Sequence, residues 1–161
     1  MSTNMRMSSL FVLLSFSLEA TVLMAAPQSA PRIDMVQYVT SGLPNSFPTT
    51  FVFRKDGTPL LVAGPGDEAR LTDFLSAKAE LPVGKADSKQ IDKLKTLLAK
   101  DGYKLANLIS KTNAFTILNL EMDSSLGSGC APCTARHDSI STILSSSGHV
   151  DTAYVPITLF H

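Results

Sequence analysis

The feature that most constrains this chain is a pair of cysteines two residues apart, Cys130-Ala131-Pro132-Cys133. It follows Ala114 to Leu120, a mostly apolar segment with little alternation, which is typical of a strand covered on both faces. A helix is predicted from the cysteines to about Ser146, with Cys133, His137, Ile140 and Leu144 on one face. Val150 to Phe160 then has the pattern of a strand bordered or interrupted by Pro156. The sequence therefore predicts a βαβ unit with the cysteines at its switch from strand to helix.

The position of the pair indicates different roles for its two sulfurs. A disulfide that closes so short a loop removes little chain entropy from the unfolded state, so the pair is expected to contribute little to the stability of the fold. In the first turn of a helix, unpaired backbone N–H groups and the positive end of the helix dipole favour a thiolate. We therefore expect Cys130 to be the attacking sulfur, and Cys133 to be more buried and to resolve a mixed disulfide. A purely structural disulfide stays open as an alternative.

Residues 1–26 have the layout of a secretory signal peptide. Arg6 precedes an apolar run from Leu10 to Ala25, and Ala25-Ala26 offers small residues for a signal peptidase. The run is shorter than the ~20 residues that a spanning helix needs, and Glu19 weakens it further. Cleavage is thus favoured over a retained anchor, and the membrane is expected as a partner only if this segment stays uncleaved. We expect residues 27–161 to form one periplasmic or secreted domain.

A hairpin and two helices are predicted ahead of the cysteine unit. The predicted elements are the strand Thr49 to Phe53, the turn Lys55-Asp56-Gly57, the returning strand Pro59 to Ala63, a helix opened by Asp67-Glu68 and a helix over Ser88 to Lys100. The strands are marked by β-branched and aromatic residues, and the second helix by apolar residues at helical spacing.

Two stretches of the chain resemble thioredoxin-like proteins, most closely the exported thiol-disulfide reductases and interchange proteins. The first is Asn119 to Ile140, which contains the Cys130-Ala-Pro-Cys133 motif after a buried strand. The second, from Phe47-Pro48 through the hairpin to Val62-Ala63-Gly64-Pro65, is similar to the family's cis-proline segment, closing hairpin and final helix. The resemblance implies an α/β fold with a mixed sheet flanked by helices. It also implies that Pro48 is a cis-proline that packs against the cysteine pair and helps to present the substrate backbone.

The two stretches occur in the opposite order to that of thioredoxins, in which the cysteines come first. We expect a circular permutation: residues 27–80 form the cis-proline half, residues 81–112 a linking helix, and residues 113–161 the Cys-x-x-Cys half. The alternative is a small β-rich platform over about residues 33–80, like that of periplasmic disulfide isomerases, followed by a linker helix and a shortened catalytic domain. Because a lone βαβ unit cannot bury its apolar faces, permutation is favoured.

The chain also departs from the family near the cysteines. Gly129 precedes the pair where thioredoxins usually carry Trp, and the loop before it is longer than the family's. The buried acid that assists the resolving cysteine has no clean counterpart. Glu121 and Asp123 are candidates for it, and solvated loop carboxylates are the alternative interpretation.

The predicted function is thiol-disulfide exchange, as a reductase or isomerase, on protein substrates in the cell envelope, together with a redox partner. No cofactor is predicted. No metal site is predicted either, because Cys130, Cys133 and His137 could supply three ligands but no fourth is evident. The formal net charge of zero gives no reason to expect nucleic acid. The alternative is a non-catalytic envelope assembly or metal-delivery protein with a thioredoxin-like shape and a local Cys130–Cys133 disulfide.

Overall fold

The computed structural model of the chain describes residues 30–44, 47–76, 87–123, 130–146 and 151–160. The expected signal segment, residues 1–26, lies outside the described residues. Within the described ranges, no helix has both the length and the apolar character needed to cross a bilayer.

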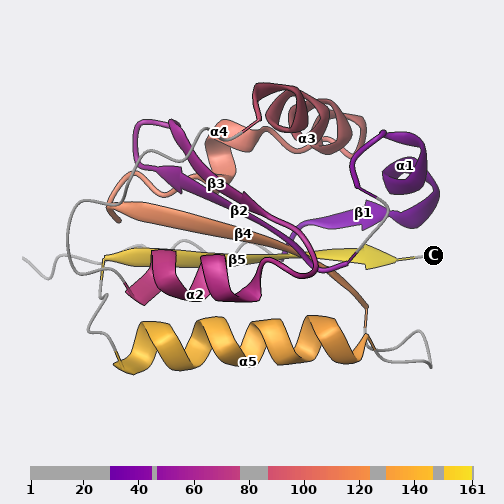
Figure 1. Cartoon of the computed structure of the whole chain (residues 1–161). Coiled ribbons are helices and arrows are strands. Elements are labelled where there is room, and N and C mark those ends of the chain that lie inside the picture. Colours follow the sequence, from indigo (N-terminus) through magenta and orange to yellow (C-terminus); the bar gives the residue numbers. More distant parts are fainter. Residues whose placement is uncertain (1–29, 45–46, 77–86, 124–129, 147–150, 161) are drawn as a thin grey trace, which may run out of the picture.

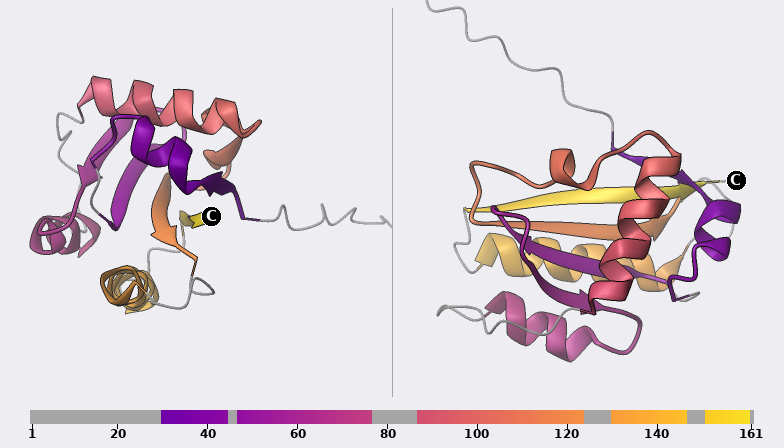
Figure 2. Two further views of the ribbon diagram at one scale, coloured as in Figure 1. Left: turned by 90° about the vertical axis from the view of Figure 1, so that its right-hand side faces the viewer. Right: turned by 90° about the horizontal axis from the view of Figure 1, so that it is seen from above.

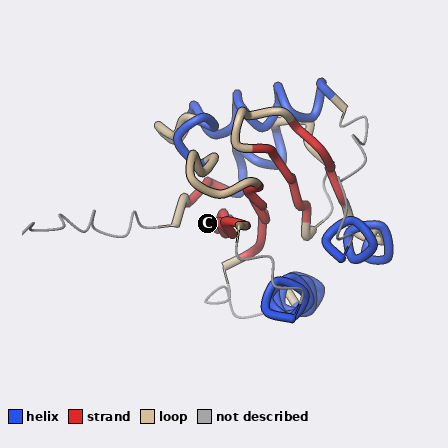
Figure 3. Tube along the Cα trace, turned by 90° about the vertical axis from the view of Figure 1, so that its left-hand side faces the viewer, coloured by secondary structure: helices blue, strands red, loops and turns tan. Residues whose placement is uncertain are grey.

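The described residues form one sheet with helices on both faces. In chain order the elements are β1 (Arg32–Asp34), α1 (Met35–Thr40), β2 (Thr49–Arg54), β3 (Pro59–Ala63), α2 (Glu68–Ser76), α3 (Ser88–Lys100), α4 (Leu105–Leu108), β4 (Phe115–Met122), α5 (Ala131–Ser146) and β5 (Thr152–Phe160). Helices α2 and α5 lie side by side below the sheet in Figure 1, and α3 and α4 lie above it. The end-on views in Figures 2 and 3 show the same three layers.

The sheet is mixed and has the strand order β1-β5-β4-β2-β3. Strands β1, β5 and β4 are parallel to one another, whereas β2 is antiparallel to both β4 and β3. The predicted α/β class, with a mixed sheet flanked by helices, is therefore confirmed. Strand β2 pairs with β4 from Thr49 opposite Leu120 to Arg54 opposite Phe115. Because this pairing joins the hairpin and the cysteine unit in one sheet, the alternative of a separate β-rich platform is wrong.

The predicted hairpin and long helices are confirmed, with shifts of a few residues at some ends. The turn between β2 and β3 closes as its sequence indicates: Gly57 has a φ of 89°, and Asp56 Oδ1 accepts from the Thr58 N–H at 2.8 Å. A positive φ is open to glycine because it has no Cβ.

Strand β5 continues through Pro156, which pairs with Asn119 of β4. The sequence led us to expect an interruption or a border there, since proline cannot donate to a strand ladder. On its other side β5 pairs with β1 over Thr158 to Phe160. Among the described residues, that flank of Pro156 therefore has no partner strand that requires an N–H, and the strand accommodates the proline.

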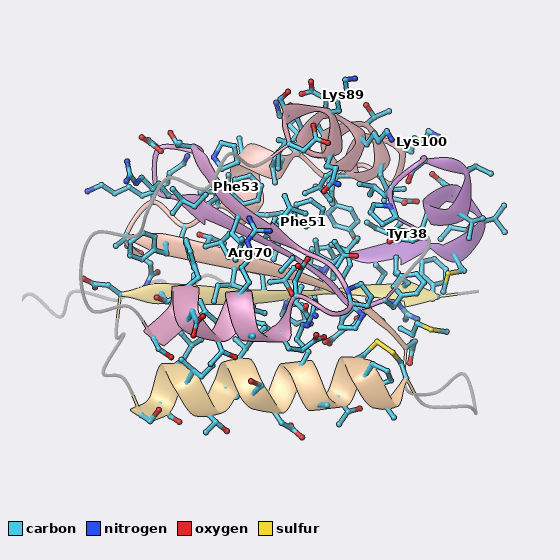
Figure 4. The ribbon with its side chains drawn as sticks, viewed as in Figure 1. Tyr38, Phe51, Phe53, Arg70, Lys89 and Lys100 are labelled. Carbon is cyan, nitrogen blue, oxygen red and sulfur yellow. A yellow bond between two sulfur atoms is a disulfide. The ribbon has the colours of Figure 1, made fainter. Side chains whose placement is uncertain are left out.

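Two apolar clusters fill the spaces on either face of the sheet. The α3 cluster includes Phe51, Phe53, Leu118 and Leu120 from the strands with Ile91, Leu94, Leu97 and Leu98 from α3. The α2–α5 cluster includes Val52, Leu60, Leu61 and Ile117 with Leu71, Phe74, Leu75 and Ile140. Alternate residues of β2 and β4 enter opposite clusters because successive side chains of a strand point to opposite faces. In Figure 4, Phe51 and Phe53 lie beneath α3, while Lys89 and Lys100 point outward from it.

Truncation of Leu94 tests the packing of α3. Its side chain is fully buried, and we expect Leu94→Ala to lower the free energy of unfolding by about 2–5 kcal/mol because it leaves a cavity. Urea unfolding followed by circular dichroism measures the change. Lys89→Ala on the exposed side of the same helix is the control and should change the value by less than about 0.5 kcal/mol. Equal effects of the two substitutions would contradict this packing.

Candidate functional site: the cysteine pair and its surroundings

Cys130 and Cys133 form a disulfide at the start of α5, with their Cα atoms 5.1 Å apart. The yellow S–S bond is visible at that end of the helix in Figure 4. The Thr134 N–H donates to the Cys130 carbonyl at 3.1 Å, so Cys130 is the N-cap residue of α5. Cys130 is half-buried, and Cys133 is only 4% exposed. The predicted place of the pair and the greater burial of Cys133 are therefore confirmed.

The backbone at the helix start is directed at the Cys130 sulfur. The Cys133 N–H donates to Cys130 Sγ over 3.2 Å. A donated N–H and the positive end of a helix dipole both stabilise negative charge on sulfur. Pro132 removes no helix bond here, because an N–H in the first turn has no carbonyl partner within the helix. After reduction, this geometry favours a thiolate at Cys130 over one at the more buried Cys133.

Pro48 is buried and follows a cis peptide bond, Phe47–Pro48. The resemblance implied this isomer. Pro48 directly precedes β2, and its neighbour Thr49 lies opposite Leu120. Pro48 is thus at the end of the sheet where β4 finishes and from which the chain continues to Cys130. Its carbonyl accepts a hydrogen bond from Arg136 Nη1 at 2.9 Å, which connects the proline to the helix of the cysteines.

Arg136 is the residue that the sequence analysis missed. Its side chain is 1% exposed, and its guanidinium makes four contacts. Nη1 donates to the carbonyls of Pro48 (2.9 Å) and Ala63 (3.1 Å). Nη2 donates to the Gly64 carbonyl (2.8 Å) and to the Glu68 carboxylate. One side chain therefore joins α5 to the segment before β2, the end of β3 and the start of α2. The signal in the sequence was a charged residue that shares a helix face with Cys133 and Ile140.

His137 lies at the border of that helix face rather than at its centre. Its side chain is 44% exposed, whereas Cys133, Arg136 and Ile140 are buried. Its Nδ1 atom is 3.0 Å from the Tyr154 hydroxyl and 3.7 Å from Glu121 Oε2. His137 is therefore half-buried, beside Tyr154 of β5 and Glu121 of β4.

A chain of polar side chains runs along this face of the sheet. The Thr50 hydroxyl donates to Asn119 Oδ1 at 2.7 Å, and Asn119 Nδ2 donates to Glu121 Oε2 at 3.1 Å and to the Tyr154 hydroxyl at 3.3 Å. Burial, followed by the nearby charge of Glu121, raises the pKa of Tyr154 well above its usual range. Tyr154 therefore remains protonated, and its hydroxyl is available as a donor.

A cavity of about 530 Å³ lies beside the disulfide and is lined by both cysteines, His137, Glu121 and Asp123, among others. Both carboxylates that the sequence analysis named as candidates for the buried acid therefore reach the neighbourhood of the cysteines. Asp123 pairs with Arg32 at 3.0 Å across this cavity. Glu121 is engaged by Asn119 and lies next to His137.

Among the described residues, no group of three or more histidine, cysteine, aspartate or glutamate side chains is arranged to hold a metal ion. No protein-family model, curated protein or solved structure matches this chain.

The contribution of Arg136 can be measured by removing its charge. Arg136→Met leaves the buried carbonyls of Pro48 and Ala63 without the Arg136 donor, whereas the Gly64 carbonyl keeps the Asp67 N–H, and we expect the free energy of unfolding to fall by about 2–5 kcal/mol. Chemical unfolding of the oxidised protein gives the value. Arg70→Met is a matched control, because Arg70 is exposed on α2, and it should change stability by less than about 0.5 kcal/mol. A loss at Arg136 no larger than at Arg70 would contradict the structural role.

The contact between Arg136 and the exposed Glu68 carboxylate gives a pH-dependent prediction. Desolvation opposes ionisation of Glu68, but hydrogen bonds from its own backbone N–H and from Arg136 outweigh it and lower the pKa of the carboxyl. A lowered pKa in the folded state stabilises the protein above the unfolded-state pKa, and this stabilisation is lost as the pH falls through the folded-state pKa. We expect Glu68→Gln to be slightly less stable than wild type at pH 7, and the difference to vanish at acidic pH. Thermal unfolding of both proteins across that range measures it, and a pH-independent difference would contradict the assignment.

Proposed function

We propose that this protein catalyses thiol-disulfide exchange on protein substrates, with Cys130 as the attacking sulfur and Cys133 as the resolving sulfur. The observation that carries the proposal is the environment of Cys130 Sγ. Cys130 is the N-cap residue of the 16-residue helix α5, and its Sγ accepts the Cys133 N–H. It is also the more exposed cysteine of the pair. These features favour a thiolate that substrates can reach.

The proposal includes a thioredoxin-like fold in circularly permuted order. It is supported by three parallel strands continued by two antiparallel ones, by a cysteine pair that follows the central strand β4, and by a cis-proline that precedes β2. It is also supported by α2 and α5, which share one face of the sheet. In this arrangement the proline segment comes from the early part of the chain and the cysteines from the late part.

Reduction of a substrate proceeds in two steps. Cys130 thiolate attacks one sulfur of the substrate disulfide, so a mixed disulfide forms and the first substrate sulfur leaves as a thiolate. Cys133 then loses its proton and attacks Cys130 Sγ, which releases the second substrate thiolate and leaves Cys130–Cys133 oxidised. Two electrons pass to the substrate, and a dithiol redox partner restores the reduced pair. Isomerisation uses the same first step. A different thiolate of the substrate then attacks the substrate sulfur of the mixed disulfide, which forms a new substrate disulfide and releases the Cys130 thiolate.

Pro48 is proposed to pack against the pair and help present the substrate backbone. Its carbonyl accepts a hydrogen bond from the buried Arg136, so the proline is positioned by the same helix that carries the cysteines. The signal-peptide pattern of residues 1–26 supports action in the periplasm or outside the cell. The Ala131-Pro132 spacer, by its resemblance to reductase-like members, supports reduction or isomerisation rather than strong oxidation.

Turnover with an artificial reductant tests the proposed activity. We expect the protein to accelerate the reduction of insulin by dithiothreitol, and Cys130→Ser to lower the rate to the uncatalysed background. Cys133→Ser should accumulate a mixed disulfide through Cys130, because the resolving thiol is absent. Cys130→Ser should accumulate little, because Cys133 is buried. Mass spectrometry of the trapped species separates these outcomes.

A different result would support the non-catalytic alternative. If the reduced protein has no thiol that iodoacetamide alkylates rapidly at neutral pH, and if it does not accelerate insulin reduction, the pair is a local clasp and the proposed activity is wrong.

A further inference from the structure

His137 is placed where a proton acceptor for the resolving thiol is needed. It follows Cys133 by one turn of α5, and both residues line the cavity beside the disulfide. Its ring makes an edge contact with the ring of Tyr154, with centroids 5.3 Å apart. Contact with Tyr154 and Glu121 on the inner side limits the orientations open to the imidazole ring.

The groups around His137 Nδ1 favour one tautomer of the ring. The Tyr154 hydroxyl receives Asn119 Nδ2 at 3.3 Å and lies 3.0 Å from His137 Nδ1, and its oxygen has a second lone pair that can accept an N–H. Glu121 Oε2 is 3.7 Å from the same nitrogen, and a carboxylate at that distance attracts an N–H and repels a lone pair. These contacts favour an Nδ1–H that donates to the Tyr154 oxygen. In the neutral imidazole this leaves Nε2 without a hydrogen and therefore as the basic atom.

The other charged groups around the cavity do not compete for this role. Arg32 of β1 and Asp123 at the end of β4 form an ion pair at 3.0 Å. Glu121 accepts from Asn119 Nδ2 and lies beside the His137 ring. Of the titratable side chains other than the cysteines that line the cavity within the described residues, His137 is the one that α5 carries together with Cys133.

We propose that His137 is the general base of the resolving step, with Glu121 and Tyr154 as the positioning residues that hold its tautomer. Nε2 takes the proton of the Cys133 thiol across the cavity, directly or through one water. Cys133 sulfur then forms its bond to Cys130 Sγ, and the bond between Cys130 and the substrate sulfur breaks. The departing substrate thiolate takes up the proton from Nε2–H, so His137 is neutral again. This inference rests on the proposed exchange activity and assigns its proton transfer.

The first test needs no turnover. In Cys130→Ser, Cys133 is the sole thiol of the chain, and its alkylation by iodoacetamide can be followed against pH. We expect His137→Gln, in this background, to lower the rate at pH 7 by about tenfold and to move the profile to higher pH. Tyr154→Phe should give a smaller change in the same direction, because His137 remains but its tautomer is no longer held. Asp138→Asn is the matched control, since Asp138 is exposed on the same helix.

The second test separates chemistry from structure. With both cysteines present, rapid mixing of the reduced protein with a disulfide peptide resolves the formation of the mixed disulfide from the release of the second peptide thiol. We expect His137→Gln to slow the release by about 10-fold or more and to leave the formation unchanged. A merely structural role would slow both steps together. His137→Asn provides a second variant, and thermal unfolding verifies that each variant is folded.

The outcomes distinguish this inference from the proposed function. If insulin reduction proceeds, and folded His137 variants keep the alkylation profile and the release rate of wild type, His137 is not the base and the exchange activity stands. If the protein has no exchange activity but the alkylation of Cys133 depends on His137, the proposed function fails and the proton contact between His137 and Cys133 stands.

Discussion

The buried guanidinium of Arg136 is the interaction on which the arrangement of the site depends. It donates to carbonyls at Pro48, Ala63 and Gly64, which lie in segments far from α5 in sequence. A buried cation without such partners would be strongly unfavourable, so the burial of Arg136 requires these segments to meet α5 at one place. Cys133 lies one turn before Arg136 on the same helix. The hydrogen bond from Arg136 to the Pro48 carbonyl therefore also holds the helix of the cysteines next to the proline segment.

The two faces of the central strand β4 differ in composition: one is apolar, whereas the other carries polar residues beside the apolar Ile117. Leu118 and Leu120 enter the cluster beneath α3. Asn119 and Glu121, on the opposite face, belong to the polar chain that ends at His137. Strand alternation produces both sets from one continuous segment. The polar chain lies between the sheet and the cysteine helix, where hydrogen bonds can orient a proton acceptor and low exposure strengthens them.

Elements with a strong local signal could be predicted from the sequence, and those governed by their neighbours could not. Ser88 to Lys100 was predicted as a helix with its observed bounds because its apolar spacing is regular. The stretch Ile33 to Val39 has only a short apolar pattern, and it is divided between β1 and α1, where the Asp34 carboxylate caps the helix and β5 supplies the strand partner. Strand β5 continues through Pro156 because β1 pairs with β5 only beyond it, over Thr158 to Phe160. No residue near Pro156 indicates where that pairing begins.

The sequence by itself determined that a cysteine pair stands at a strand-to-helix switch, that Cys130 is more accessible than Cys133, and that a hairpin and two helices precede them. These features follow from local spacing and from the dipole and open N–H groups of a helix start. Only the tertiary structure decided that the hairpin and the cysteine unit share one sheet, that Arg136 is buried against Pro48, and that Tyr154 and Glu121 meet His137. Those contacts join residues distant in sequence, and whether a charged side chain is buried depends on partners that no local pattern contains.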